Sequence, residues 1–189
     1  MGSGNIIAAH SYKELVDKSV IIVSGQFRSA NEVINMARNI NDINKPDPNI
    51  LGAGQVYQFE VDKYLKGGGA KTIYVVQLEG FLTGEQIGIE LDEENIKKAR
   101  KARKYIPAKL ENPYVLFLEP LVGFPDLKNY YTGAIHPWRF DLSNPDQVVP
   151  ESVWEDALSV FPPKKVSKFF DQIANPDLSE GYPPPPIQP

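Results

Sequence analysis

The segment Leu65–Gln77, LKGGGAKTIYVVQ, contains residue types that bind phosphate in many proteins, namely three glycines followed by Lys71 and Thr72. A Walker A loop needs a glycine directly before the lysine-threonine pair and a helix after it, so that backbone N–H groups converge on the phosphate. Here Ala70 precedes the pair, and a β-branched run typical of a strand follows it. The pattern therefore favours a glycine-rich hairpin turn over a phosphate site.

Acidic residues that could bind a hard cation occur at two places, a loop starting at Asp47 and the stretch Glu90–Glu94. A calcium loop from Asp47 would place Leu51 and Gln58 where an oxygen ligand and a bidentate glutamate are needed. The acids of Glu90–Glu94 suit the start of a helix, where negative charge is favourable. The chain contains no cysteine, which excludes disulfides, thiol catalysis and Cys-ligated metals. We expect neither a metal nor a cofactor.

His10 and His136 are the two histidines of the chain, so a Ser-His-Asp triad would need one of them. No Gly-x-Ser-x-Gly motif marks a nucleophile, and no nucleophile, base and orienting group can be assembled by spacing. We therefore expect that the protein is not an enzyme. The segment HPWRFD favours His136 as a structural side chain or as a contact at the rim of a binding site, beside Trp138 and Arg139.

The densest positive run is Ile96–Tyr105, IKKARKARKY, which could contact a nucleic acid or an anionic surface. Its apolar stripe is thin, and Glu93 and Glu94 stand one turn ahead, so a solvated helix face is the favoured interpretation. The net charge of −4 also weighs against a general nucleic-acid role, because phosphate neutralisation supplies most non-specific affinity.

The composition is that of an ordinary globular domain, with 189 residues, 42% of them hydrophobic and 23% charged. No apolar run approaches the ~18 residues of a membrane span, and the N-terminus lacks the profile of a signal peptide. Met1–Gly4 is interpreted as a remnant of cloning.

Hydrophobic periodicity predicts five strands and several helices. The predicted strands are Val20–Phe27, Gln55–Leu65, Thr72–Leu78, Asn112–Pro120 and Tyr130–Leu142, the last kinked or bulged at Gly133 and Pro137. The predicted helices are a short one capped by Ser11 and ending near Lys18, Ala30–Ile43, Glu93–Tyr105 capped by Asp92, Pro150–Phe161 and a last one within 162–176.

Five strands with a helix between the third and fourth are typical of an OB-fold. We predict a mainly β fold with added helices, a five-stranded OB-like closed barrel with extra C-terminal helices; a generic antiparallel α+β sheet is the alternative. Residues 1–10 are expected to be disordered or cloning-derived, 11–149 to form the barrel, 150–175 to form helices packed on it, and 176–189 to be a proline-rich tail.

OB-folds bind ligands on strands two and three and the flanking loops. That face would present Tyr57 or Tyr74 beside the loop Leu121–Asn129. Tyr57 shares a strand face with Phe59 and is therefore expected in the core. The candidate binding residues are Tyr74, Phe124, His136, Trp138 and Arg139.

Several stretches of the chain resemble a broad group of bacterial secreted or lipid-anchored proteins of uncharacterised function. These stretches are KELVDKSVIIVSGQF, YQFEVDKYLKG, TIYVVQLEG, NPYVLFLEP and YYTGAIHPWRFDL, within Tyr12–Leu142. The group is similar in outline to the OB-fold inhibitory domain of tissue inhibitors of metalloproteinases. In that domain an amino-terminal cysteine chelates the zinc of the target, and this chain has no cysteine to take that role.

The resemblance implies export from a bacterium, to the extracellular space or cell surface, with any membrane attachment through a lipid anchor outside this sequence. The expected function is a non-enzymatic extracellular binding module for a protein, peptide or glycan, with nucleic acid disfavoured. The alternatives are a protease-inhibitor-like module without the metal-chelating cysteine and a binder of single-stranded nucleic acid.

Overall fold

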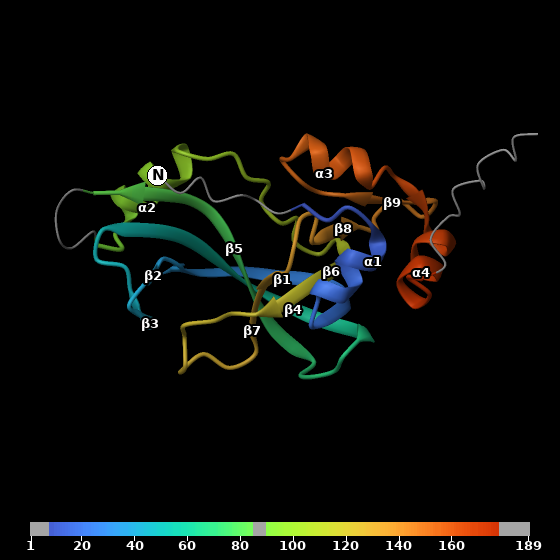
Figure 1. The fold of residues 1–189 in the computed structure, drawn as a ribbon, viewed down its shortest axis with the longest axis horizontal. Coiled ribbons are helices and arrows are strands. Elements are labelled where there is room, and N and C mark those ends of the chain that lie inside the picture. The colour runs from blue at the N-terminus through green and yellow to red at the C-terminus, as the bar shows by residue number, and fades with distance from the viewer. Residues whose placement is uncertain (1–7, 85–89, 178–189) are drawn as a thin grey trace, which may run out of the picture.

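The computed structural model of the chain describes residues 8–84 and 90–177. Its fold is mainly β with added helices, as the hydrophobic pattern predicts (Figure 1). The helices are α1 (Tyr12–Lys18), α2 (Glu93–Lys101), α3 (Glu155–Val160) and α4 (Val166–Ala174). The strands are β1 (Ile21–Asn35), β2 (Arg38–Asn39), β3 (Asp42–Pro46), β4 (Ile50–Lys66), β5 (Thr72–Thr83), β6 (Pro113–Pro120), β7 (Tyr130–Gly133), β8 (Arg139–Asp141), β9 (Gln147–Pro150) and β10 (Lys164–Lys165).

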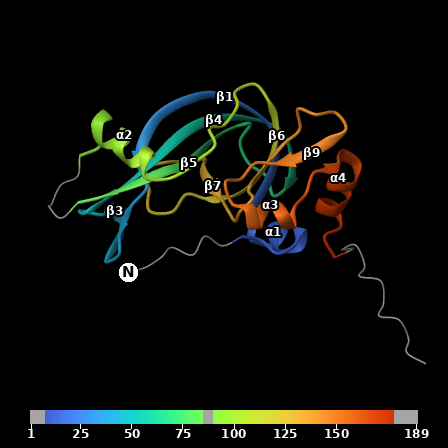
Figure 2. The same cartoon turned by 90° about the horizontal axis from the view of Figure 1, so that it is seen from above.

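Five of these strands pair in a ring. β1, β4 and β5 are antiparallel neighbours, β5 pairs with β7 in parallel, β7 pairs with β6, and β6 returns to pair with β1. β8, β9 and β10 extend the sheet from β6, while β2 and β3 form a separate hairpin. α2 lies at one end of the molecule, and α1, α3 and α4 gather at the other (Figures 1 and 2).

Strand β6 and the first residues of β1 are buried on both faces, because their alternate residues enter two different hydrophobic clusters. Tyr114, Leu116 and Leu118 of β6 point to the interior of the ring, whereas Val115 and Phe117 point outward to the helices. Since side chains alternate between faces along a strand, burial of both faces requires a continuous apolar run. This accounts for the unbroken hydrophobic stretches that predicted β1 and β6.

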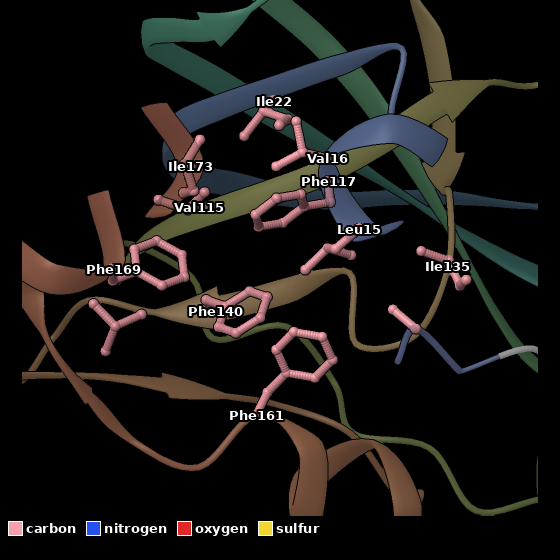
Figure 3. Close-up of a cluster of buried hydrophobic side chains, with 12 residues drawn as sticks. Leu15, Val16, Ile22, Val115, Phe117, Ile135, Phe140, Phe161, Phe169 and Ile173 are labelled. Carbon is pink, nitrogen blue, oxygen red and sulfur yellow. The ribbon is translucent and has the colours of Figure 1, made fainter. Parts of the chain in front are cut away.

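The outer cluster joins β6 and β8 to helices from both ends of the chain (Figure 3). The ring of Phe140 lies 5.4 Å from that of Phe117 and 5.0 Å from that of Phe169 in α4, centroid to centroid. Leu15 of α1 and Phe161 beside α3 complete the cluster. The C-terminal segment therefore shares a core with the strands that precede it.

Helix α1 begins where the sequence predicts, at the N-cap Ser11. The Ser11 hydroxyl accepts a hydrogen bond of 3.1 Å from the backbone N–H of Glu14. The bond to Ser11 satisfies one of the free N–H donors at the helix start, and the Glu14 carboxylate accepts a second bond of 2.7 Å from the N–H of His10, which precedes the cap.

The hairpin predicted at the glycine-rich segment is confirmed. β4 and β5 pair antiparallel from Ile50 opposite Thr83 to Glu60 opposite Thr72. Gly67, at the end of β4, has φ +71°, a left-handed conformation that residues with a Cβ rarely adopt. The strand alternation is confirmed from Tyr57 to Val61, since Tyr57, Phe59 and Val61 are buried inside the ring. Leu65 departs from it and packs against the outer cluster, because the pairing with β1 shifts register there.

The predicted helix Ala30–Ile43 is wrong. β1 continues to Asn35, and Val33 pairs with Gln55 of β4; the hairpin of β2 and β3 follows. Ile40, which is part of the helical period, and Ile43, at the end of the predicted helix, are 95% and 51% exposed. Pairing with β4 outweighs the local helical pattern because it satisfies the backbone groups of a long strand.

Other boundaries also differ from the prediction. The last strand is divided into β7 and β8, with a cis peptide bond at His136–Pro137 between them. The helix predicted from Pro150 begins only at Glu155, because Pro150 belongs to β9. The helix predicted to reach Tyr105 ends at Lys101, so the residues that follow can turn toward the sheet.

Candidate functional site

A cavity with a volume of about 950 Å³ lies beside β5. Its walls come mainly from β5, the connection after α2, the segment from the end of β7 to the start of β8, and residues 151–154 before α3, with Met36 and Ile50 beside them. Most of the lining residues are apolar or aromatic. A volume near 1,000 Å³ with apolar walls and few polar groups is typical of a small-molecule site.

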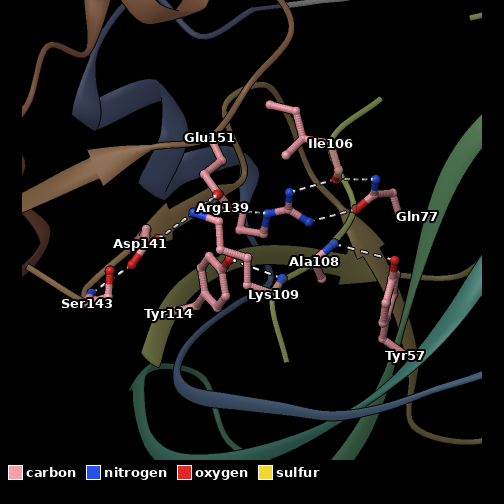
Figure 4. Close-up of polar contacts among 10 residues, drawn as sticks. All are labelled: Tyr57, Gln77, Ile106, Ala108, Lys109, Tyr114, Arg139, Asp141, Ser143 and Glu151. Atoms are coloured by element: carbon pink, nitrogen blue, oxygen red, sulfur yellow. Dashed lines mark hydrogen bonds and ion pairs between the residues drawn. The ribbon is translucent and has the colours of Figure 1, made fainter. Parts of the chain in front are cut away.

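Arg139 forms the polar base of this cavity and is only 2% exposed. Its Nη1 donates to Oε1 of Gln77 at 2.7 Å, and its Nη2 donates to the carbonyl of Ile106 at 2.8 Å (Figure 4). Its Nε lies 2.9 Å from Oε1 of Glu151. That last contact is an ion pair without hydrogen-bond alignment, since both atoms lack a hydrogen-bond partner.

Glu151 and Asp141 extend the network through Lys109, whose Nζ lies 3.2 and 3.3 Å from their carboxylates. Burial alone would raise the pKa of Asp141, but hydrogen bonds from Ser143 and Lys109 outweigh it and hold that pKa below its usual value. Burial, together with the charge of Glu151, raises the pKa of Tyr114. Each charged group of the network therefore has a partner.

The same network fixes the connection from α2 to β6. Gln77 Nε2 also donates to the Ile106 carbonyl, at 2.8 Å. The hydroxyls of Tyr57 and Tyr114 accept hydrogen bonds from the N–H groups of Ala108 and Lys109, at 3.4 and 3.3 Å. The connection is thus held at one end of the strand ring, and it forms one wall of the cavity.

Arg103 is the half-buried cation of the cavity wall. Its guanidinium carbon lies 5.7 Å from the ring centroid of Trp154 and 6.0 Å from that of Phe81. Within the described residues it makes no ion pair and no side-chain hydrogen bond. Burial lowers the pKa of Arg103, as expected when a charged group leaves water without a counter-ion.

His136 lines the cavity close enough to Arg103 to feel its charge. Burial, assisted by the positive charge of Arg103, lowers the pKa of His136 to about 4. The imidazole is therefore neutral at pH 7 and can donate one hydrogen bond and accept another. Its backbone carbonyl accepts from the N–H of Ala9 at 2.7 Å, which fixes this part of the wall.

Trp138 also lines the cavity and lies against the backbone of Gly133. A Cβ at Gly133 would stand 2.3 Å from Cγ of the indole, which leaves no room for any larger residue. The guanidinium of Arg139 lies 5.2 Å from the centroid of the Trp138 ring, so the polar base supports the indole.

The five candidate binding residues do not form one group. His136, Trp138 and Arg139 meet at the cavity, where Nη1 and Nη2 of Arg139 are already hydrogen-bonded and its Nε is ion-paired with Glu151. Tyr74 stacks on Tyr130 with 4.8 Å between ring centroids, and Phe124 lies 3.9 Å below the guanidinium of Arg38. Neither Tyr74 nor Phe124 lines the cavity.

The sequence pattern missed Arg103, Trp154 and Phe81. The basic run 96–105 is predicted to be a solvated helix face, and Lys97, Lys98 and Lys101 are indeed exposed. Because α2 ends before it, Arg103 leaves the helical period and turns toward the aromatic rings. The local signal for this turn of Arg103 was its position near the end of the basic run, where the helical period of the apolar residues stops.

No protein-family model matches the chain, and no curated protein or solved structure matches it either. None of the helices in residues 8–84 and 90–177 is long and apolar enough to cross a membrane.

Proposed function

We propose that the chain is a non-enzymatic binding module on an OB-like closed barrel, and that the cavity beside β5 is its ligand site. The ring strands pair in the order β1-β4-β5-β7-β6. Helix α2 lies between β5 and β6, which are the third and fourth ring strands in chain order, and this arrangement supports the OB-like architecture. The extracellular setting is part of the proposal and rests on the stretches that resemble exported bacterial proteins.

The observation that carries the proposal is the cavity itself, about 950 Å³ with apolar walls and a fixed polar base. Ligand sites of this kind bury most of an apolar ligand and orient it with a few polar groups. The base is already organised, because Arg139 is held by Gln77, Ile106 and Glu151. A preorganised wall lowers the entropic cost of binding.

The polar groups of the lining favour binding over catalysis. The hydroxyl of Thr132 donates to the Val76 carbonyl at 3.0 Å, and that of Ser152 accepts from the Trp154 N–H at 3.1 Å. In the described part of the chain, no side chain hydrogen-bonds to the His136 ring to orient it as a base. A nucleophile activated by a positioned base is therefore not assembled here.

The test uses the two tryptophans of the chain, Trp138 and Trp154, which both line the cavity. A neutral apolar fluorophore, N-phenyl-1-naphthylamine, should bind saturably, brighten and quench the tryptophan emission. Ala134→Phe, which fills the cavity, should weaken binding at least tenfold. Ala30→Phe makes the same change at an exposed position of β1 and should bind as the unaltered protein does. Equal binding by both variants, or no saturable binding, would overturn the proposal.

A further inference from the structure

We propose that the ligand of the cavity is a small amphipathic organic acid, whose carboxylate pairs with Arg103 and whose apolar body lies against the aromatic wall. This inference rests on the proposed function and specifies its ligand class. Within the described residues, one half-buried cation of the cavity wall has no counter-ion.

Arg103 is that uncompensated charge. A half-buried guanidinium normally has a carboxylate or carbonyl partner, because removing a cation from water is costly. Arg100, one turn earlier, follows this rule: it pairs with Glu79 and donates to Gln55 Oε1 at 3.0 Å. In the described ranges Arg103 has only the faces of Phe81 and Trp154. A planar donor fork beside an empty volume is suited to receive a carboxylate.

The charge balance of the lining points the same way. Among the described lining residues, Arg103, Lys104 and Arg139 are cationic and Glu151 alone is acidic. Glu151 is already paired with Arg139 and with Lys109. The cavity thus has a local positive excess, although the whole chain carries a net charge of −4. Such a local field favours an anionic ligand.

The remaining wall specifies an apolar body for that ligand. Leu78, Phe81 and Ile135 line the cavity, and both tryptophans contribute their rings. The ring of Trp154 lies beside Arg103, with 5.7 Å between the ring centroid and the guanidinium carbon. One cation and aromatic walls fit a carboxylate on a ring better than a multiply hydroxylated ligand.

His136 supplies an independent readout of the same contact. The positive charge of Arg103 helps to lower the pKa of His136. A bound carboxylate would neutralise that charge and raise the pKa of His136, whereas a neutral ligand of the same shape would leave the effect of Arg103 in place. Only His10 and His136 contribute imidazole signals to NMR spectra of the chain.

The experiment compares 1-naphthaleneacetate with 1-naphthaleneacetamide, which has the same shape but no charge, by calorimetry on the full chain. We expect the acid to bind at least tenfold more tightly than the amide. Arg103→Gln should reduce this difference to within twofold, mainly by weakening the binding of the acid, and Arg103→Lys should retain part of it. Lys101→Gln removes the same charge from an exposed position at the end of α2 and should have no effect.

In parallel, NMR titration should show that the acid raises the pKa of His136 and the amide does not. Equal affinity for acid and amide, or an equal loss of both in Arg103→Gln, would overturn the inference while the neutral fluorophore still binds. Failure of all three compounds to bind would instead overturn the proposed function. Thermal unfolding of each variant separates loss of binding from loss of the fold.

Discussion

Arg139 and Glu151 form a buried ion pair, with Nε and Oε1 2.9 Å apart and side chains only 3% and 9% exposed. The two residues are also joined through the backbone, since the N–H of Glu151 donates to the carbonyl of Arg139 at 2.9 Å. The pair connects β8, at the base of the cavity, to the segment that leads to α3. The cavity base and the C-terminal segment are thereby one structural unit.

Glu151→Gln should destabilise the protein by about 3 kcal/mol, because it leaves the buried guanidinium of Arg139 without a counter-ion. The measurement is the free energy of unfolding in urea. As a control, Asp17→Asn disrupts the exposed pair of Lys13 and Asp17, 3.1 Å apart, and should cost less than about 1 kcal/mol. Similar losses in the two variants would show that the buried pair has no special role.

Stability should fall as the pH falls from about 6.5 to 4, in part through His136. The folded pKa of His136, about 4, lies below the unfolded value of about 6.5. Between these values the unfolded state binds more protons, so acid favours unfolding; below about 4 both states are protonated and the effect saturates. The contribution is at most about 3 kcal/mol, at about 1.4 kcal/mol per pH unit.

This pH effect is measured by urea unfolding at pH 7 and pH 4.5. His136→Gln should lose about 2 kcal/mol less stability between these pH values than the unaltered protein. His10→Gln is the control and should show the full loss, since His10 is exposed. The assignment to His136 would fail if all three proteins lost stability in parallel.

Gly133→Ala should displace the indole of Trp138, because the new Cβ would stand 2.3 Å from its Cγ. We expect a loss of about 1–3 kcal/mol in the free energy of unfolding, as for other overpacked sites, and a shift of the tryptophan emission. Gly68→Ala is the matched control, since a Cβ at Gly68 meets nothing within 4 Å. An unshifted emission in Gly133→Ala would contradict the packing of Trp138.

Phe169→Ala should cost about 3–5 kcal/mol, because it removes a fully buried ring of α4 from the outer cluster. Val122→Ala truncates an apolar side chain that is 63% exposed and should change stability by less than about 0.5 kcal/mol. Urea unfolding distinguishes the two cases. If Phe169→Ala lowers the free energy of unfolding by this amount and unfolding remains a single cooperative transition, the C-terminal helix belongs to the same folding unit as the strands.

Local patterns predicted the elements whose environment is uniform along the chain. The alternation from Tyr57 to Val61 is readable because one face of β4 is buried inside the ring and the other is more polar. The cap of α1 is readable because Ser11 and Glu14 interact within one turn. Signals of this kind depend on residues only a few positions apart.

The sequence-based prediction failed where contacts with residues distant in the sequence determine the local structure. Residues Ala30–Ile43 have a helical period, yet Val33 becomes part of a strand because Gln55 of β4 lies beside it. Arg103 has the composition of a solvated helix face, and only the end of α2 at Lys101 turns it toward Trp154. Neither outcome is encoded in the neighbouring residues alone.

The amino-acid sequence by itself therefore determined the mainly β class, the hairpin at the glycines, the capped starts of α1 and α2, and the absence of thiol chemistry. Only the tertiary structure decided that His136, Trp138 and Arg139 share a cavity with Arg103 and Trp154. The physical reason is that strand pairing and burial bring together residues from separate segments. Whether the charge of Arg103 has a counter-ion depends on the side chains that those segments place beside it.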